Sequence, residues 1–199
     1  MPTLPLLQRI ERVSAPAAEP ITAAEAKAQM RVEHTDDDTL IDRLVDTAID
    51  FVDVTGSLGK AMITQTWGEW FAPNPGSIVL SLGPVQSVSA IKYYDTDNAL
   101  QTATLSNFHV LGPKDQTVLK PKSGYSWPTT FLRDDAIKIE YVVGYGDAAS
   151  DVPQTVRHAL MMLVAHLYEN RELSIERSMS QVPFGFEALI ERERSSWYG

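Results

Sequence analysis

The sequence predicts an α+β fold, in which a helical core carries a small inserted antiparallel β region and a C-terminal amphipathic tail helix. Helical periodicity of apolar residues occurs on both sides of the middle of the chain, within residues 23–56 and 152–171. Between these stretches, residues 62–145 contain short alternating segments separated by turns rich in Pro and Gly, which is typical of antiparallel strands. A separate apolar cluster at residues 182–190 predicts the tail helix.

The chain begins with an extended arm over residues 1–20, because four prolines in this stretch disfavour a helix. A central domain over residues 21–172 and a tether with a partner-docking segment over residues 173–199 follow it. The arm contains more apolar residues than a tail without contacts would be expected to have, so we expect it to lie on its own domain or on a neighbouring subunit. These apolar residues are Leu4, Leu6, Leu7, Ile10 and Val13.

Two helices are predicted after the arm, over residues 23–31 and 36–56. Thr22 and Glu25 have the spacing of a capping box, which marks the start of the first helix. The second helix should end near Gly56, because glycine suits a C-terminal cap. Its apolar positions recur at three- and four-residue steps on one side: Leu40, Ile41, Leu44, Val45, Ala48, Ile49 and Val52.

Acidic residues fill the other side of the second helix. Between Arg31 and Asp53 there are eight acidic and two basic residues. This acidic stripe is either a solvated helix face or a surface that meets a basic partner or lines a channel. Its members are Asp38, Asp42, Asp46, Asp50 and Asp53.

The β region ends in a strand over residues 137–145, whose apolar and charged residues alternate. Gly144 and Gly146 then allow a sharp turn into the helix over residues 152–171, for which Asp151 is the expected N-cap. The earlier strands are expected at residues 63–67, 78–82, 85–94, 100–104, 108–111 and 117–119.

The tail cluster reads as a short amphipathic helix on a flexible tether. It either packs back on its own domain or docks into a groove of a partner, where apolar anchors carry most of the affinity. The apolar residues concerned are Phe184, Phe186, Leu189 and Ile190.

Composition narrows the function further. The chain has 199 residues, 44% of them hydrophobic, a net charge of −9 and no cysteine. These values indicate a folded protein without disulfides and argue against one that grips nucleic acid through its phosphates. We found no secretion signal and no apolar run long enough for a membrane span, so we expect a product assembled in the cytoplasm, without membrane contact.

No catalytic signature is present. His166 and Glu169 have a spacing that suits a metal, but no second such pair completes a site. Gly144–Asp147 precedes a helix yet lacks the spacing and the lysine of a phosphate-binding loop. We therefore expect no enzyme activity, no metal and no cofactor.

Seven short motifs, in this order, resemble the head–tail connector (adaptor) family of long-tailed phages, including gene transfer agents. They are Glu19–Lys27, Thr64–Trp67, Gly83–Val88, Tyr141–Asp147, Asp151–Pro153, His166–Arg171 and Pro183–Leu189.

The resemblance implies a ring of about twelve subunits under the portal protein, which joins the DNA-filled head to a stopper or tail-neck protein in the virion. DNA would pass through the ring without sequence-specific binding. The resemblance also implies that the C-terminal segment attaches to the portal. The matching positions are Pro183, Phe184, Gly185, Phe186, Ala188 and Leu189, to which we add Ile190 from the apolar pattern.

Two alternatives stay open at this point. One is another neck component, a stopper or a tail terminator. The other is a small acidic enzyme whose site the motifs do not reveal.

Overall fold

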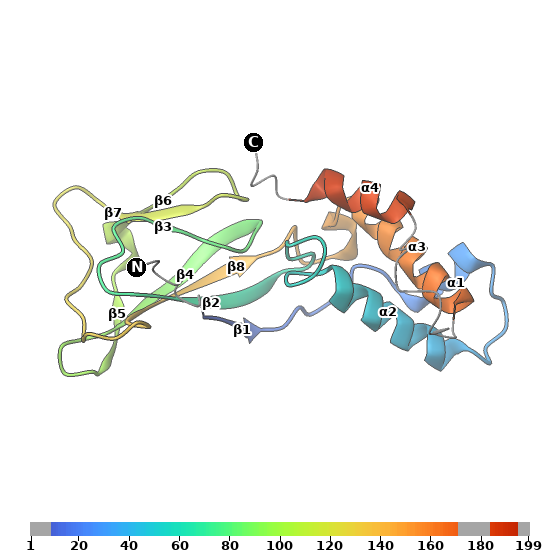
Figure 1. Ribbon diagram of the computed structural model, residues 1–199, viewed down its shortest axis with the longest axis horizontal. Coiled ribbons are helices and arrows are strands. Elements are labelled where there is room, and N and C mark those ends of the chain that lie inside the picture. Colours follow the sequence, from blue (N-terminus) through green and yellow to red (C-terminus); the bar gives the residue numbers. More distant parts are fainter. Residues whose placement is uncertain (1–8, 171–183, 195–199) are drawn as a thin grey trace, which may run out of the picture. The chain divides into compact units, whose positions relative to one another are not determined.

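The computed structural model describes residues 9–170 and 184–194. The chain forms two compact units (Figure 1). The β unit consists of residues 1–16 and 64–144, and the helical unit consists of residues 17–63 and 145–199. The predicted mixture of helices and antiparallel sheets is confirmed, and each unit has its own buried interior.

The β unit contains a five-stranded antiparallel sheet with the strand order β1-β2-β8-β4-β5. The bounds of these strands, in chain order, are β1 Ile10–Ser14, β2 Gln65–Phe71, β4 Val85–Tyr94, β5 Leu100–Ala103 and β8 Ile137–Val143. A three-stranded sheet has the order β3-β7-β6, with β3 at Ile78–Val79, β6 at Phe108–Leu111 and β7 at Val118–Pro121. A short 3-10 helix, η1 (Leu105–Asn107), precedes β6.

Alternation in β8 determines which face of the large sheet is buried. Ile137, Ile139 and Tyr141 are fully buried, whereas Lys138 and Glu140 lie on the opposite face. The small sheet alternates in the same way, with Ile78 and Leu119 buried.

The predicted N-terminal arm is partly a strand of its own sheet. Residues 10–14 form β1 and pair antiparallel with β2, so Ile10 lies opposite Glu69 and Arg12 lies opposite Trp67. For these residues the structure decides in favour of the arm's own domain rather than a neighbouring subunit. Residues 1–8 lie outside the described part of the chain.

The helical unit contains α1 (Ala23–Met30), α2 (Asp38–Val52), the 3-10 helix η2 (Ala149–Asp151), α3 (Gln154–Glu169) and α4 (Phe184–Glu193). The predicted capping box is present: Thr22 Oγ1 accepts from Glu25 N–H at 3.2 Å, and Glu25 Oε2 accepts from Thr22 N–H at 2.9 Å. Arg157 of α3 donates to Pro20 O at 2.9 Å and pairs with Glu25, which ties the start of α1 to α3.

Two predicted helix ends were wrong. The helix after Thr35 ends at Val52 and not near Gly56, because the chain turns at Asp53. Asp151 is not the N-cap of α3: it lies in η2, where its Oδ2 accepts from Ala148 N–H at 2.9 Å, and α3 begins after Pro153. Residue 146 is a glycine because the Asp151 side chain lies close to its backbone: a Cβ there would lie 2.3 Å from Asp151 Oδ2.

Candidate docking surfaces

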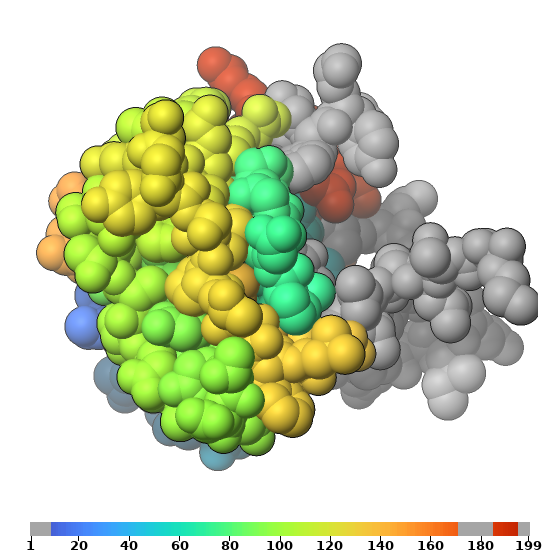
Figure 2. Space-filling view, turned by 90° about the vertical axis from the view of Figure 1, so that its left-hand side faces the viewer, coloured from blue at the N-terminus to red at the C-terminus, as the bar shows by residue number. Residues whose placement is uncertain are grey.

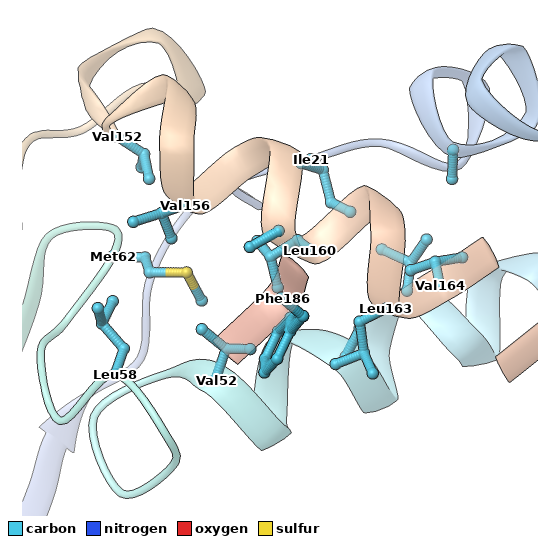
Figure 3. Close-up of a cluster of buried hydrophobic side chains, with 14 of the residues drawn as sticks. Ile21, Val52, Leu58, Met62, Val152, Val156, Leu160, Leu163, Val164 and Phe186 are labelled. Atoms are coloured by element: carbon cyan, nitrogen blue, oxygen red, sulfur yellow. The ribbon is translucent and has the colours of Figure 1, made fainter. Parts of the chain in front are cut away.

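The tail helix α4 is packed on its own unit. Phe186 and Ile190 are 2% and 3% exposed, and both belong to the core cluster of the helical unit. Figure 3 shows the Phe186 ring near Val52 of α2 and Leu160 and Leu163 of α3. For Phe186 and Ile190 the structure therefore favours packing on the chain's own domain over docking in a partner groove.

Contacts besides those of Phe186 and Ile190 with the core also hold α4 on the helical unit. The Phe186 ring lies 6.2 Å from the Phe51 ring, centroid to centroid. Thr155 Oγ1 donates to Glu193 Oε1 at 2.9 Å, so α3 also holds the end of α4. A Cβ on Gly185 would lie 3.0 Å from Met162 Cε, which shows how closely the two helices approach.

This packing separates the residues that are predicted to attach to the portal. Phe186 and Ile190 are core residues, and Leu189 is partly buried against the same cluster. Ala188 is exposed and lies beside exposed Glu187. Pro183 and the side chain of Phe184 lie outside the described residues.

Three of the five residues of the predicted acidic stripe of α2 are exposed. Asp42, Asp46 and Asp50 are exposed along the helix, at successive four-residue steps. Asp38 forms an ion pair with Lys27. Asp53 was wrongly included: it is 8% exposed, and its Oδ1 accepts from Met62 N–H at 3.0 Å. This bond fastens the turn that follows α2.

Charge is unevenly divided between the two units. The β unit contains eight basic and eight acidic residues, whereas the helical unit contains nine basic and eighteen acidic residues. The whole net charge of −9 therefore belongs to the helical unit. A surface that repels phosphate is expected there and not on the β unit.

An aromatic and cationic cluster on the β unit was missed by the sequence reasoning. The Trp70 and Tyr94 rings stack with centroids 6.3 Å apart, and the guanidinium carbons of Arg9 and Arg133 lie 5.0 Å from Trp70 and 3.8 Å from Tyr94. Lys138 lies 5.3 Å from the Trp70 centroid. Trp70, Tyr94 and Lys138 lie on β2, β4 and β8, whereas Arg9 precedes β1 and Arg133 lies in the loop before β8. These residues become neighbours only in the assembled sheet.

Carboxylates balance the cations of this cluster. Lys138 Nζ lies 2.5 Å from Glu11 Oε1 and 3.0 Å from Glu140 Oε1. The hydrogen bond from Lys138 lowers the pKa of Glu11, and hydrogen bonds from Arg133 lower the pKa of Asp135. Because each of these cations has an acidic partner, the cluster fastens β1 and the loop before β8 to the sheet rather than attracting phosphate.

Among the described residues, no group of three or more His, Cys, Asp or Glu side chains is arranged to hold a metal ion. Within the same part of the chain, none of the helices has the length and hydropathy of a membrane span.

One segment of the sequence matches the model of a known protein family. Residues 129–194 match the family model of phage gp6-like head-tail connector proteins. The match extends from the loop before β8 to the end of α4 and includes four of the seven motifs on which the resemblance rested. The resemblance is thereby confirmed for this segment. No curated protein matches the chain.

Structural comparison covers nearly the whole chain. The fold is similar to a chain in the neck of an empty GTA particle computed with C6 symmetry, with a TM-score of 0.75 and 21% identity over 94% of this chain and 95% of that chain. It is also similar to a chain of the virion of a native gene transfer agent (GTA) particle, with a TM-score of 0.71 and 20% identity over the same shares. For the neck of a native GTA particle computed with C12 symmetry, the values are 0.69 and 22%, again over 94% and 95%. These similarities establish a shared fold.

Proposed function

We propose that the protein is a structural head–tail connector (adaptor) of a tailed phage or phage-like particle. It forms a ring under the portal, joins the head to neck or tail proteins and lets DNA pass. The observation that carries this proposal is the similarity of fold to neck chains over 94% of the sequence, together with the connector family match at residues 129–194. The virion neck is then its place of action.

The symmetry of the particles that contain similar chains supports a ring. The similar chains belong to necks computed with C6 and C12 symmetry. A ring requires a heterologous contact, in which two different surface patches of one chain meet the corresponding patches of its neighbours. We propose a ring of about twelve copies, as the family resemblance implies.

The portal contact is proposed for the C-terminal segment, residues 183–190. Phe186 and Ile190 hold α4 on the helical unit, so a folded α4 offers the portal its exposed side around Ala188. Using the two buried side chains for docking would first require α4 to leave its seat. Exposing both side chains would cost about 3–6 kcal/mol, and their burial in a portal groove would have to offset this cost.

DNA passage is proposed to depend on the acidic stripe, now Asp42, Asp46 and Asp50. All three are exposed and lie on the unit that carries the net negative charge. If this side of α2 faces the channel, it repels the phosphate backbone and lowers the friction of the moving duplex.

Electron microscopy of the full-length protein, mixed with purified portal rings of the same particle, tests the function. A connector adds a ring-shaped layer directly beneath the portal. A stopper or tail terminator would bind only after that layer is present, and an enzyme would add no layer at all. The last two outcomes contradict the proposal, and portal rings alone provide the baseline.

A further inference from the structure

The loop between β7 and β8 presents an apolar side chain to solvent. Leu132 is 90% exposed, the highest value among the large apolar side chains of the described residues, and its neighbour Phe131 is 45% exposed. We call these two residues the knob. Isolated exposed leucines need no explanation, but the loop around this one is unusually well fixed.

Both sides of Leu132 are held by hydrogen bonds. Phe131 N–H donates to Tyr94 O at 3.1 Å. Arg133 donates from Nε and Nη2 to the Asp135 carboxylate at 2.6 and 2.9 Å, and from Nη1 to Asn98 Oδ1 at 3.1 Å. Figure 2 shows this part of the loop, in gold, beside the green β4–β5 hairpin. The knob is therefore pre-organised, so little conformational entropy is lost when it is buried.

A surface that suits the knob lies on the outer face of the three-stranded sheet. Val79 and Val118 are paired across β3 and β7, and Val118 is paired with Leu111 across β7 and β6. These three residues form an apolar row, in which Val79 and Leu111 are each 41% exposed. Their chain neighbours Ile78 and Leu119 point inward instead. An apolar row on the solvent face of a sheet is unusual unless something covers it.

Each patch has an exposed side chain beside it whose charge is opposite to one beside the other patch. Exposed Asp134 lies two residues after Leu132, and exposed Asp97 lies in the hairpin beside the knob. Arg133, between Leu132 and Asp134, is paired with Asp135. Lys120, which is paired with His109 across β7 and β6, is exposed on the same face as the apolar row and supplies its positive charge. Because the β unit has equal numbers of acidic and basic residues, this separation of charge is local and not a consequence of net charge.

We propose that the knob of one copy packs on the apolar row of a second copy of this chain, with Asp134 facing Lys120. In Figure 1 the three-stranded sheet and the β4–β5 hairpin lie on opposite sides of the β unit. A contact between two such different patches is heterologous and continues from copy to copy until the ring closes. The inference deepens the proposed function, since it rests on the ring beneath the portal.

Cysteine crosslinking tests the contact, because the chain has no cysteine of its own. The full-length Leu132→Cys/Leu111→Cys variant is assembled on portal rings and oxidised. We expect a ladder of covalent multimers on a non-reducing gel, whereas a mixture of the two single variants should stop at dimers. Leu132→Cys/Val13→Cys is the matched control, since Val13 is also exposed but lies on β1, outside the row.

Further variants test the contact through charge, and the first of them needs no disulfide. Leu132→Asp should fold with an unchanged melting temperature, because the side chain is exposed, and should lose ring formation; Thr129→Asp in the same loop should retain it. Asp134→Lys should lower the yield of crosslinked multimers roughly two- to fivefold, and adding Lys120→Glu should restore it.

The outcomes separate this inference from the proposed function. A layer that forms without a ladder above the control, and that tolerates Leu132→Asp, would overturn the knob contact and leave the connector function intact. A wild-type chain that forms no layer beneath the portal would overturn both.

Discussion

The Tyr141 hydroxyl donates a hydrogen bond of 2.9 Å to Glu69 Oε2 inside the β unit, where both residues are fully buried. Ser81 completes the arrangement, donating from Oγ to Glu69 Oε1 at 2.6 Å and from its N–H to Oε2 at 3.2 Å. A buried carboxylate is tolerated only when donors surround it. This pair therefore ties β2, β8 and the segment after β3 together at the centre of the sheet.

Tyr141→Phe should destabilise the β unit by about 1–3 kcal/mol, because the Glu69 carboxylate loses a donor while staying buried. Chemical denaturation followed by tryptophan fluorescence measures the loss. Tyr125→Phe is the matched control, since Tyr125 is 57% exposed and should leave the stability unchanged. Equal stabilities of the two variants would show that the bond contributes nothing.

The same pair predicts a dependence on alkaline pH. Burial, followed by the negative charge of Glu69, raises the pKa of Tyr141 above its ordinary value. Above pH of about 10 the unfolded chain loses this proton and the folded chain keeps it, so the free energy of unfolding falls as the pH rises. Denaturation at a series of pH values between about 9 and 11 should show a steeper decline in wild type than in Tyr141→Phe. Identical slopes would contradict the assignment.

Elements with a clear hydrophobic period were predictable from the sequence, and their ends were not. The periodicity of α2 was read correctly, yet continuing it to Asp53 placed that residue on the exposed side. The helix stops one residue earlier, and the chain turns Asp53 inward to the Met62 N–H. Hydrophobic periodicity cannot predict this turn, because the turn is stabilised by a hydrogen bond to a residue nine positions further along the chain.

The aromatic cluster illustrates a second limit. Trp70, Tyr94 and Arg133 are distant in the sequence and become neighbours only through the order β2-β8-β4 of the large sheet. No local pattern specifies that order. The tail helix was different: its anchors Phe186 and Ile190 stood out in the sequence, but only the packing shows that they fill the unit's own core.

The capping box of α1 predicts a loss of stability in acid. The hydrogen bond from the Thr22 backbone lowers the pKa of Glu25, with Arg157 contributing further. Stability from a depressed carboxyl pKa is present above the unfolded value of 4.5 and is lost as the pH falls through the folded value. Glu25→Gln should therefore flatten the stability profile below pH of about 5, as measured by thermal unfolding. Glu33→Gln, which changes an exposed acid of the same unit, should leave the profile unchanged.

Neutralising the acidic stripe should separate assembly from DNA passage. Asp42→Asn/Asp46→Asn/Asp50→Asn removes like charges spaced four residues apart, so the free energy of unfolding should stay the same or rise by a few tenths of a kcal/mol. Ring formation should persist. DNA delivery by the assembled particles should fall, because the channel lining no longer repels phosphate.

A control triple distinguishes position from net charge. Glu33→Gln/Asp147→Asn/Glu169→Gln removes three exposed acids of the same unit outside the stripe, and should leave delivery at the wild-type level. Delivery per assembled particle is measured by transfer of a marker gene. If both triples deliver normally, the stripe does not line the channel; if both fail, total charge and not the stripe is responsible.

Ala188→Arg should abolish attachment to the portal while the protein stays folded. Ala188 lies on the exposed side of α4, so the larger charged side chain meets solvent in the free protein and obstructs only a partner. Co-sedimentation with portal rings measures attachment, and thermal unfolding confirms the fold. His158→Arg, at an exposed position of α3, is the matched control and should bind normally.

Phe186→Ala provides the contrasting case. Truncating this core ring should destabilise the helical unit by about 3–5 kcal/mol, so any loss of binding would follow from unfolding. If Ala188→Arg binds the portal as well as wild type does, the exposed side of α4 is not the docking surface. Attachment through the buried anchors, after α4 has left the helical unit, would instead predict that Phe186→Ala loses binding even under conditions where its helical unit is folded.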